Sequence, residues 1–170
     1  MKRPQAKVPV FKAPWWLPEG HSQTLWRKFS PAPKTALQPR QRQRIELADG
    51  DFIDLDWAAG TCAAGSESKY PRELPTVLLL HGLCGCSSSP YVLSLQQLLS
   101  AHGYTSAAMN LRSCSGEPNR LARAYHSGNS DDLEEVFSKL RSDLPDGKFV
   151  VIGFSLGANV MLKWLGENPR

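Results

Sequence analysis

Ser155 lies between two glycines in the stretch Gly153-Phe154-Ser155-Leu156-Gly157. The apolar run before it, residues 149–152, predicts a buried strand, and residues 156–166 predict a helix. A serine in a glycine-flanked turn between a strand and a helix is typical of a nucleophile elbow, which holds the hydroxyl clear of the backbone. Glycine suits positions 153 and 157 because the chain folds back there with little room for side chains. The pattern predicts Ser155 as a nucleophile that attacks a carbonyl group.

A second loop, His81-Gly82-Leu83, follows the apolar run of residues 76–80, which predicts a strand next to that of Ser155. Attack on a carbonyl leaves negative charge on its oxygen, and backbone N–H groups can stabilise that charge. Leu156, at the start of the helix, is predicted to supply one N–H and Leu83 the other. Gly82 is assigned to the same site as a loop glycine. His81 is interpreted as a residue that fixes the loop by hydrogen bonds, not as a base.

The elements around these loops alternate between strand and helix patterns. After residues 76–80, a helix at about 90–102, a strand at 105–111 and a helix at about 131–144 lead to the strand that carries Ser155. Continuous apolar runs are typical of strands buried on both faces of a parallel sheet. The order predicts the α/β class with a mostly parallel, doubly wound sheet.

An antiparallel β-hairpin is predicted at the start of this sheet, over residues 44–57. Apolar residues alternate with polar ones on both sides of Asp49-Gly50, which is predicted to form a two-residue turn. Asp51, Asp54 and Asp56 are expected on the solvent face of the second strand, because no glycine-centred calcium loop follows them.

Charge divides the chain near residue 44. The net charge of +4 combines +9 over residues 1–44 with −5 over residues 45–170. A basic arm can contact nucleic acid or anionic lipid, but no nucleic-acid-binding motif accompanies the charge. We therefore predict that residues 1–44 form an irregular basic arm, rich in Pro and Trp, that packs on a body formed by residues 45–170. Nucleic acid is not an expected partner, and its binding by the arm is the alternative.

The cysteines and the apolar runs argue against a cofactor and a membrane span. Cys62, Cys84, Cys86 and Cys114 show no C-x-x-C pair and no matched histidine spacing, so reduced thiols and no metal site are expected. No apolar run approaches the roughly 20 residues that span a bilayer, and the basic N-terminus lacks the features of a signal peptide. The expectation is a cytoplasmic protein with no cofactor and no integral membrane segment.

Seven motifs are spread over nearly the whole chain. They are Pro14-Trp15-Trp16-Leu17, Gly20-His21-Ser22-Gln23-Thr24-Leu25-Trp26, Asp49-Gly50-Asp51-Phe52-Ile53-Asp54-Leu55-Asp56-Trp57, His81-Gly82-Leu83, Cys114-Ser115-Gly116-Glu117-Pro118-Asn119-Arg120, Arg123-Ala124-Tyr125-His126-Ser127-Gly128 and the elbow itself. Together they resemble the YheT-type subfamily of α/β-hydrolases, which is related to the acyl-hydrolysing ABHD proteins of mammals. The resemblance implies a Ser-Asp-His carboxylesterase or lipase that acts on small-molecule or lipid acyl esters. Of its three catalytic residues, only Ser155 has a matching position.

The sequence departs from that family at three points. Ser113 stands where a glycine is expected before Cys114, and Ala158 replaces a glycine after the elbow. The third departure concerns the triad, whose order is Ser, then the acid, then His. After Ser155 the chain offers only Glu167 as an acid, and its four histidines all precede the serine.

Without the acid and the histidine, the chain is predicted to be the N-terminal half of an α/β-hydrolase fold, truncated and nearly inactive alone. Loss of one triad member can reduce turnover by a factor on the order of 10⁶. Three hypotheses stay open. The chain is a truncated serine hydrolase, a non-catalytic fragment or binding module, or one half of a split hydrolase that a second chain completes.

Overall fold

The computed structural model describes residues 10–29, 39–60 and 74–168. The chain divides into two compact units, residues 1–32 and residues 33–170, which are described separately. Cys62 and most of the loop expected between residue 58 and residue 72 lie outside the described residues.

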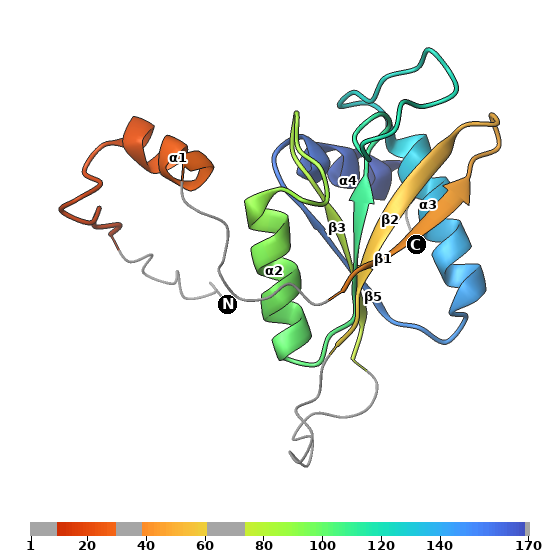
Figure 1. Ribbon diagram of the computed structural model, residues 1–170, viewed down its shortest axis with the longest axis horizontal. Coiled ribbons are helices and arrows are strands. Elements are labelled where there is room, and N and C mark those ends of the chain that lie inside the picture. The colour runs from red at the N-terminus through yellow and green to blue at the C-terminus, as the bar shows by residue number, and fades with distance from the viewer. Residues whose placement is uncertain (1–9, 30–38, 61–73, 169–170) are drawn as a thin grey trace, which may run out of the picture. The chain divides into compact units, whose positions relative to one another are not determined.

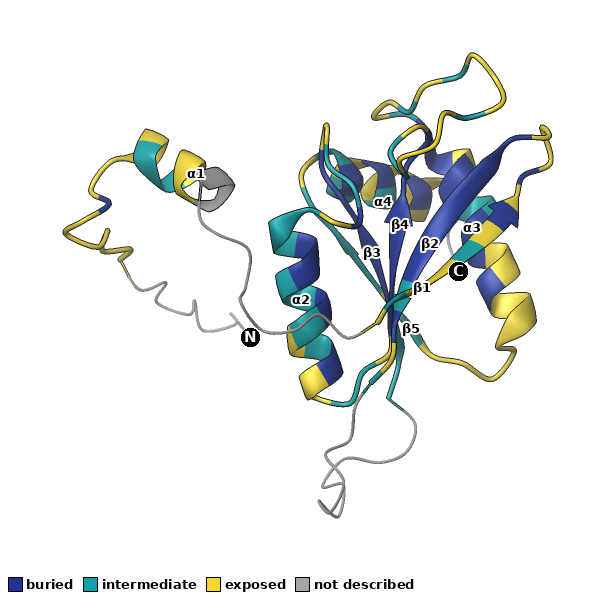
Figure 2. Cartoon of the chain, viewed as in Figure 1, coloured by how far each residue is buried: buried dark blue, intermediate teal, exposed yellow. Residues whose placement is uncertain are grey.

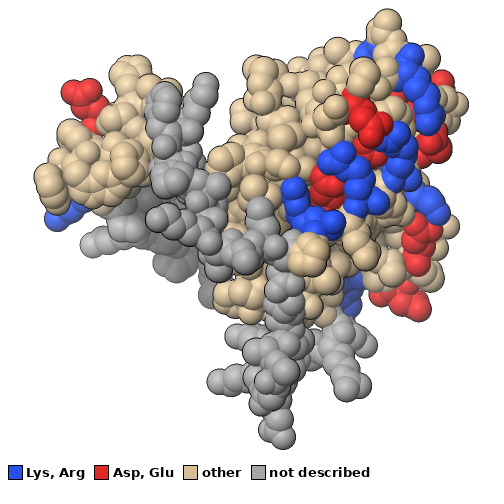
Figure 3. Space-filling view, in the orientation of Figure 1, with Lys and Arg blue, Asp and Glu red and all other residues tan. Residues whose placement is uncertain are grey.

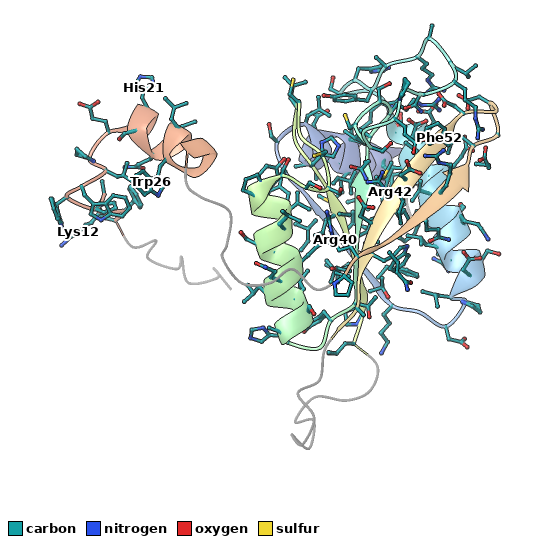
Figure 4. All side chains as sticks on the ribbon, viewed as in Figure 1. Lys12, His21, Trp26, Arg40, Arg42 and Phe52 are labelled. Atoms are coloured by element: carbon teal, nitrogen blue, oxygen red, sulfur yellow. The ribbon has the colours of Figure 1, made fainter. Side chains whose placement is uncertain are left out.

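The N-terminal unit contains a helix, α1 (Gly20–Phe29). The prediction that residues 1–44 are irregular is therefore wrong for this part. The Ser22 hydroxyl donates to the Glu19 carbonyl at 2.7 Å, and the Gln23 amide donates to the Leu17 carbonyl at 2.8 Å. The Trp26 ring meets Trp16 edge to face, with ring centroids 5.1 Å apart (Figure 4). Packing of this unit on the body stays a prediction.

The larger unit is built on a five-stranded sheet with the order β1-β2-β4-β3-β5. The strands are β1 (Gln41–Glu46), β2 (Phe52–Ala58), β3 (Thr76–Leu80), β4 (Ser106–Asn110) and β5 (Phe149–Gly153). The pairs β1–β2 and β2–β4 are antiparallel, whereas β3 pairs in parallel with both β4 and β5. The predicted α/β class with a hairpin at its start is confirmed.

Helices cover both faces of this sheet (Figure 1). Helix α2 (Pro90–Ala101) packs on one face, and helices α3 (Ser130–Asp143) and α4 (Leu156–Glu167) pack together on the other. The larger core layer joins α3 and α4 to the sheet, and its members include Leu78, Leu80, Met109, Leu133, Val136, Leu140, Val160 and Trp164. A smaller layer lies under α2 and contains Val77, Leu79, Val92 and Ala108. The central strands are buried on both faces (Figure 2), which explains their continuous apolar runs.

The hairpin turn differs from its prediction by one residue. Leu47 pairs with Asp51, so the loop has three residues, and its last residue, Gly50, adopts φ 85°. A three-residue loop that ends in a left-handed residue is a common hairpin connection. This register places Arg42 opposite Asp56.

The three aspartates of β2 and its preceding turn are buried, so their predicted place on the solvent face is wrong. Asp51, Asp54 and Asp56 are 0%, 1% and 4% exposed. Arg44 binds both carboxylate oxygens of Asp54 at 2.8 Å, and Arg42 binds those of Asp56 at 2.8 and 2.9 Å. Lys/Arg and Asp/Glu side chains consequently mingle over the side of the body where β1 and β2 lie (Figure 3).

Candidate active site

Ser155 lies in the turn that joins β5 to α4. It is exposed and has φ 51° and ψ −113°, outside the backbone regions that a serine ordinarily occupies. The Phe154 N–H donates to the Leu80 carbonyl at 3.0 Å, and the Gly157 N–H donates to the Phe154 carbonyl at 2.9 Å. The end of β3 and the first turn of α4 therefore hold the serine in this conformation.

The two glycines of the elbow lie in close backbone contact with their surroundings. A Cβ on Gly153 would lie 2.5 Å from the Cα and N of Ala158. A Cβ on Gly157 would lie 2.5 Å from the His81 carbonyl oxygen and 2.7 Å from that of Leu80. Neither position accepts a side chain unless the backbone moves. The tight turn therefore depends on both glycines.

The loop after β3 lies against the elbow. A Cβ on Gly82 would lie 3.3 Å from the Cβ of Ser155, so the two backbones approach closely. Leu83 is 67% exposed, and Leu156 is the first residue of α4, where an N–H has no partner within its helix. Within the described residues, neither the Leu83 nor the Leu156 N–H makes a hydrogen bond. Two free donors thus belong to the segments that flank the Ser155 hydroxyl.

His81 is a structural residue of this loop. Its Nε2 accepts the Leu111 N–H at 3.1 Å, so the proton is on Nδ1, which donates to the Gly82 carbonyl at 2.7 Å. Burial lowers the pKa of His81 below its ordinary value. Both ring nitrogens bond to backbone, which agrees with the interpretation that His81 fixes the loop.

A polar network connects the end of this loop to the hairpin. Ser87 donates through its hydroxyl to Asp56 and through its N–H to the Asn110 side chain at 2.8 Å. Arg42 neutralises Asp56, while Arg40 donates to the Ser87 carbonyl at 2.9 Å, and both arginines extend from β1 and the residue before it (Figure 4). A buried carboxylate with this many donors fixes the loop relative to the sheet.

Acid is expected to destabilise the chain through two buried carboxylates. Burial alone would raise the pKa of Asp51, but hydrogen bonds, first from Asn119, outweigh it and hold the pKa at about 2. Burial would also raise the pKa of Asp56, but hydrogen bonds from its donors, of which Arg42 has the largest effect, outweigh burial. The pKa of Asp56 is therefore also about 2. Both values lie below the ordinary 3.8, so the stabilisation is present above that pH and is lost as the pH falls toward 2.

Urea unfolding between pH 6 and about pH 2.5 measures this loss. Asp51→Asn should flatten the acid limb of the free energy of unfolding, whereas the exposed Asp146→Asn should leave it unchanged. A free energy that stays constant over this range contradicts the assignment.

Ser113, at the departure from the family pattern, adopts φ 63°. A left-handed backbone costs a non-glycine residue roughly 1–2 kcal/mol, which explains why glycine is expected there. Ser113→Gly should raise the free energy of unfolding by about 0.5–1 kcal/mol, because the greater freedom of glycine in the unfolded chain offsets part of the relief. Ser127, an exposed loop residue without a positive φ, is the matched control, and Ser127→Gly should destabilise. Urea unfolding compares the two, and destabilisation by Ser113→Gly contradicts the prediction.

The remaining histidines, which precede Ser155, and Glu167, which follows it, do not form hydrogen bonds with Ser155. His102 bonds the Leu98 carbonyl at the end of α2, and His126 accepts the Gly128 N–H at 3.0 Å. Glu167 pairs with Lys163 and accepts the Ser130 hydroxyl. It lies at the far end of α4, about 18 Å from Ser155 at 1.5 Å per residue. His21 belongs to the separate N-terminal unit. Within the described body, no histidine or acid forms a hydrogen bond with the Ser155 side chain.

One pocket among the described residues has a lining that does not include Ser155. It has a volume of about 470 Å³ and lies between the loop that enters α3 and the end of α4. Its lining includes two ion pairs, Arg123 with Asp131 and Lys163 with Glu167. Among all residues that the structure describes, no three His, Cys, Asp or Glu side chains lie close enough together to hold a metal ion. No described helix has the length and hydropathy to cross a membrane.

A family model described as the alpha/beta hydrolase fold matches residues 75–170, more than half of the chain. The chain belongs to the alpha/beta hydrolase fold family. This alpha/beta hydrolase is similar to YheT of Escherichia coli, a protein named as an esterase, with 36% identity over 119 residues that cover 70% of this chain and 33% of YheT. Phospholipase ABHD3 of Homo sapiens is 36% identical over 155 residues, which cover 89% of this chain and 36% of ABHD3. The resemblance inferred from the motifs is confirmed.

This alpha/beta hydrolase spans about a third of the length of those two relatives. Among solved structures, it is similar to XC6422 from Xanthomonas campestris, described as an a/b serine hydrolase without lid. The TM-score is 0.58 at 21% identity, and the match covers 81% of this chain and 59% of XC6422. At that identity the likeness establishes the fold.

The tyrosines around the Ser155 loop were missed by the sequence reasoning. Tyr91 and Tyr125 each place a hydroxyl on a backbone N–H of the loop after β3. Tyr125 belongs to one of the seven motifs, and this membership could have identified it as a residue of the site. Tyr91 lies in the first turn of α2 and carries no motif.

Proposed function

We propose that this chain provides the nucleophile and the oxyanion hole of a serine hydrolase that acts on carboxylic acyl esters. The observation that carries the proposal is Ser155, an exposed serine held at φ 51° beside two free N–H groups. Strained backbone of this kind persists where the surroundings fix it, and it is common at functional sites. The names of the relatives, an esterase and a phospholipase, support a small-molecule or lipid acyl ester as the substrate.

The proposed reaction has two steps. Ser155 Oγ attacks the ester carbonyl carbon, and the negative charge on the oxygen is stabilised by the Leu83 and Leu156 N–H groups. The bond to the alcohol then breaks, the alcohol leaves with a proton, and the acyl group stays on Ser155. Water hydrolyses this acyl-enzyme and restores the serine. A histidine must accept and return the proton in both steps.

The base and its acid partner are proposed to come from a further segment, in the same protein or in a second chain, that completes the sheet at β5. Among the described strands, β5 pairs only with β3 and ends the sheet. Val150 on this strand is 43% exposed. The continuous apolar run of β5, however, is typical of a strand that is buried on both faces. A further strand on this edge would cover it and bring new loops to the carboxyl ends of the strands, where Ser155 lies.

Labelling with a fluorophosphonate tests the nucleophile. The chain is expressed alone and together with any reading frame encoded downstream, and the labelled peptide is identified by mass spectrometry. We expect labelling of Ser155 in the completed protein, its loss in Ser155→Ala, and no change in Ser138→Ala, which alters an exposed serine of α3. The chain alone should react far more slowly, because it lacks a base.

Two results would contradict the proposal. Labelling at a residue other than Ser155 excludes it as the nucleophile. Absence of any Ser155 labelling in the completed protein favours the non-catalytic binding module.

A further inference from the structure

Two tyrosine hydroxyls hold the loop after β3 at neighbouring positions. The Gly82 N–H donates to the Tyr91 hydroxyl oxygen at 2.9 Å, and the Cys84 N–H donates to that of Tyr125, also at 2.9 Å. Leu83 lies between them, and its N–H makes no hydrogen bond to any described residue. Of three consecutive N–H groups, the two outer ones are occupied and the central one is free.

Both tyrosines are fixed by packing next to the elbow. The Tyr91 ring contacts that of Phe154, the neighbour of Ser155, with centroids 4.8 Å apart. The Tyr125 ring meets His81 edge to face at 6.2 Å. The two hydroxyls therefore do not swing freely.

The loop backbone is shaped around these hydroxyls. A Cβ on Gly85 would lie 2.7 Å from the Tyr91 hydroxyl oxygen, so only glycine leaves room for it. Cys84 adopts φ 54°, a left-handed conformation that a cysteine rarely takes. Its bond to Tyr125 helps to keep it there. This turn changes the direction of the chain immediately after Leu83.

We propose that Tyr91 and Tyr125 are positioning residues that reserve the Leu83 N–H for the oxygen of the substrate. The inference rests on the proposed function, in which that N–H belongs to the oxyanion hole. A donor stabilises developing charge best when its orientation is set before the reaction begins. The hydroxyls occupy the two flanking donors and stop the loop from turning either of them toward the site.

Amide hydrogen exchange tests the contacts without needing turnover. In the ¹⁵N-labelled chain, NMR should show the Gly82 and Cys84 N–H groups protected and the Leu83 N–H exchanging freely. Tyr91→Phe should remove protection at Gly82, and Tyr125→Phe should remove it at Cys84. The control is Tyr104→Phe, whose hydroxyl has no hydrogen bond in the described part of the chain. It should change neither. Equal protection of all three amides, or an unchanged pattern in both variants, overturns the proposal.

Titration with phenylboronic acid tests the consequence for the site. Its boron accepts the Ser155 oxygen and forms a tetrahedral adduct, while the serine proton passes to solvent. In the completed protein, we expect shifts of the Leu83 and Leu156 amide signals, and none in its Ser155→Ala variant. Tyr91→Phe and Tyr125→Phe should each weaken binding about five- to tenfold, as the loss of one ordinary hydrogen bond predicts.

The two measurements separate the failures. If the completed protein binds no boronate, the proposed nucleophile fails, and the exchange pattern alone decides whether the tyrosines hold the loop. If the boronate binds with unchanged affinity to both phenylalanine variants, the positioning role is wrong even where the exchange pattern is as expected.

Discussion

Replacing Arg112 with methionine should lower the free energy of unfolding by about 3–5 kcal/mol, the range for breaking a buried ion pair from one side. The Arg112 side chain is fully buried and binds both oxygens of Asp132, at 2.8 and 2.6 Å, and one oxygen of Asp51 at 2.8 Å. These carboxylates are 1% and 0% exposed. Removal of the guanidinium leaves two buried negative charges with fewer donors.

Arg120→Met is the matched control for this prediction. Arg120 also binds a carboxylate with two nitrogens, but its side chain is 48% exposed and its partner Glu46 is 60% exposed. Exposed pairs contribute little because water solvates both partners well. Urea unfolding near pH 7 compares the variants. If both lose the same stability, burial is not the source of the Arg112 effect.

Gly157→Ala should destabilise the chain at or above the upper end of the roughly 1–3 kcal/mol that overpacking costs. The added Cβ would meet the His81 and Leu80 carbonyl oxygens at 2.5 and 2.7 Å. These are backbone atoms at the end of β3, which cannot rotate away as a side chain can. Either the elbow or the loop after β3 must move, so boronate binding at Ser155 should weaken as well.

Gly166→Ala, in the same helix, separates this contact from helix propensity. A Cβ on Gly166 would meet nothing within 4 Å. The substitution should therefore stabilise the chain by about 0.8–1 kcal/mol, the advantage of alanine over glycine in a helix. Opposite signs for the two substitutions are expected in thermal or urea unfolding. Stabilisation by both would show that the elbow tolerates a side chain.

Most of the body could be predicted because strands such as β3 and β5 carry continuous apolar runs. Residues 76–80 and 149–152 are continuous apolar runs, and the structure has β3 and β5 there. The helix expected from residue 90 to about 102 is α2, which begins at the same proline. The start of α2 could be predicted from neighbouring residues alone, because proline fits the first turn of a helix.

The register of the β1–β2 hairpin could not be predicted from the local sequence. A two-residue turn and a three-residue turn at Asp49-Gly50 differ by one residue, and a slip of one residue moves every side chain of a strand to the other face relative to its partner. Only the observed register places Arg42 opposite Asp56 and Arg44 opposite Asp54. The burial of these aspartates could not be predicted, because the pairing that permits it depends on that single residue.

The candidate site likewise has one part that could be predicted from the sequence and another that could not. The elbow is a local motif, so its serine and glycines could be identified from five consecutive residues. The tyrosine contacts join residues far apart in the chain, Cys84 and Tyr125 among them, and no local pattern contains that information. The polar network around Asp56 has the same origin, because it brings together β1, β2, β4 and the loop before α2.

The parallel pairing of β3 with β5 also constrains how the chain folds. Thr76 pairs with Phe149, 73 residues later, whereas Gln41 and Trp57 in the hairpin are only 16 residues apart. Closing a long loop costs entropy before its contacts form, so non-local parallel strands pair slowly. The turn at Ser155 depends on the Leu80 carbonyl and on the backbone of β3, and it cannot form until that pairing is complete. Reactivity at Ser155 therefore reports that β3 and β5 have paired.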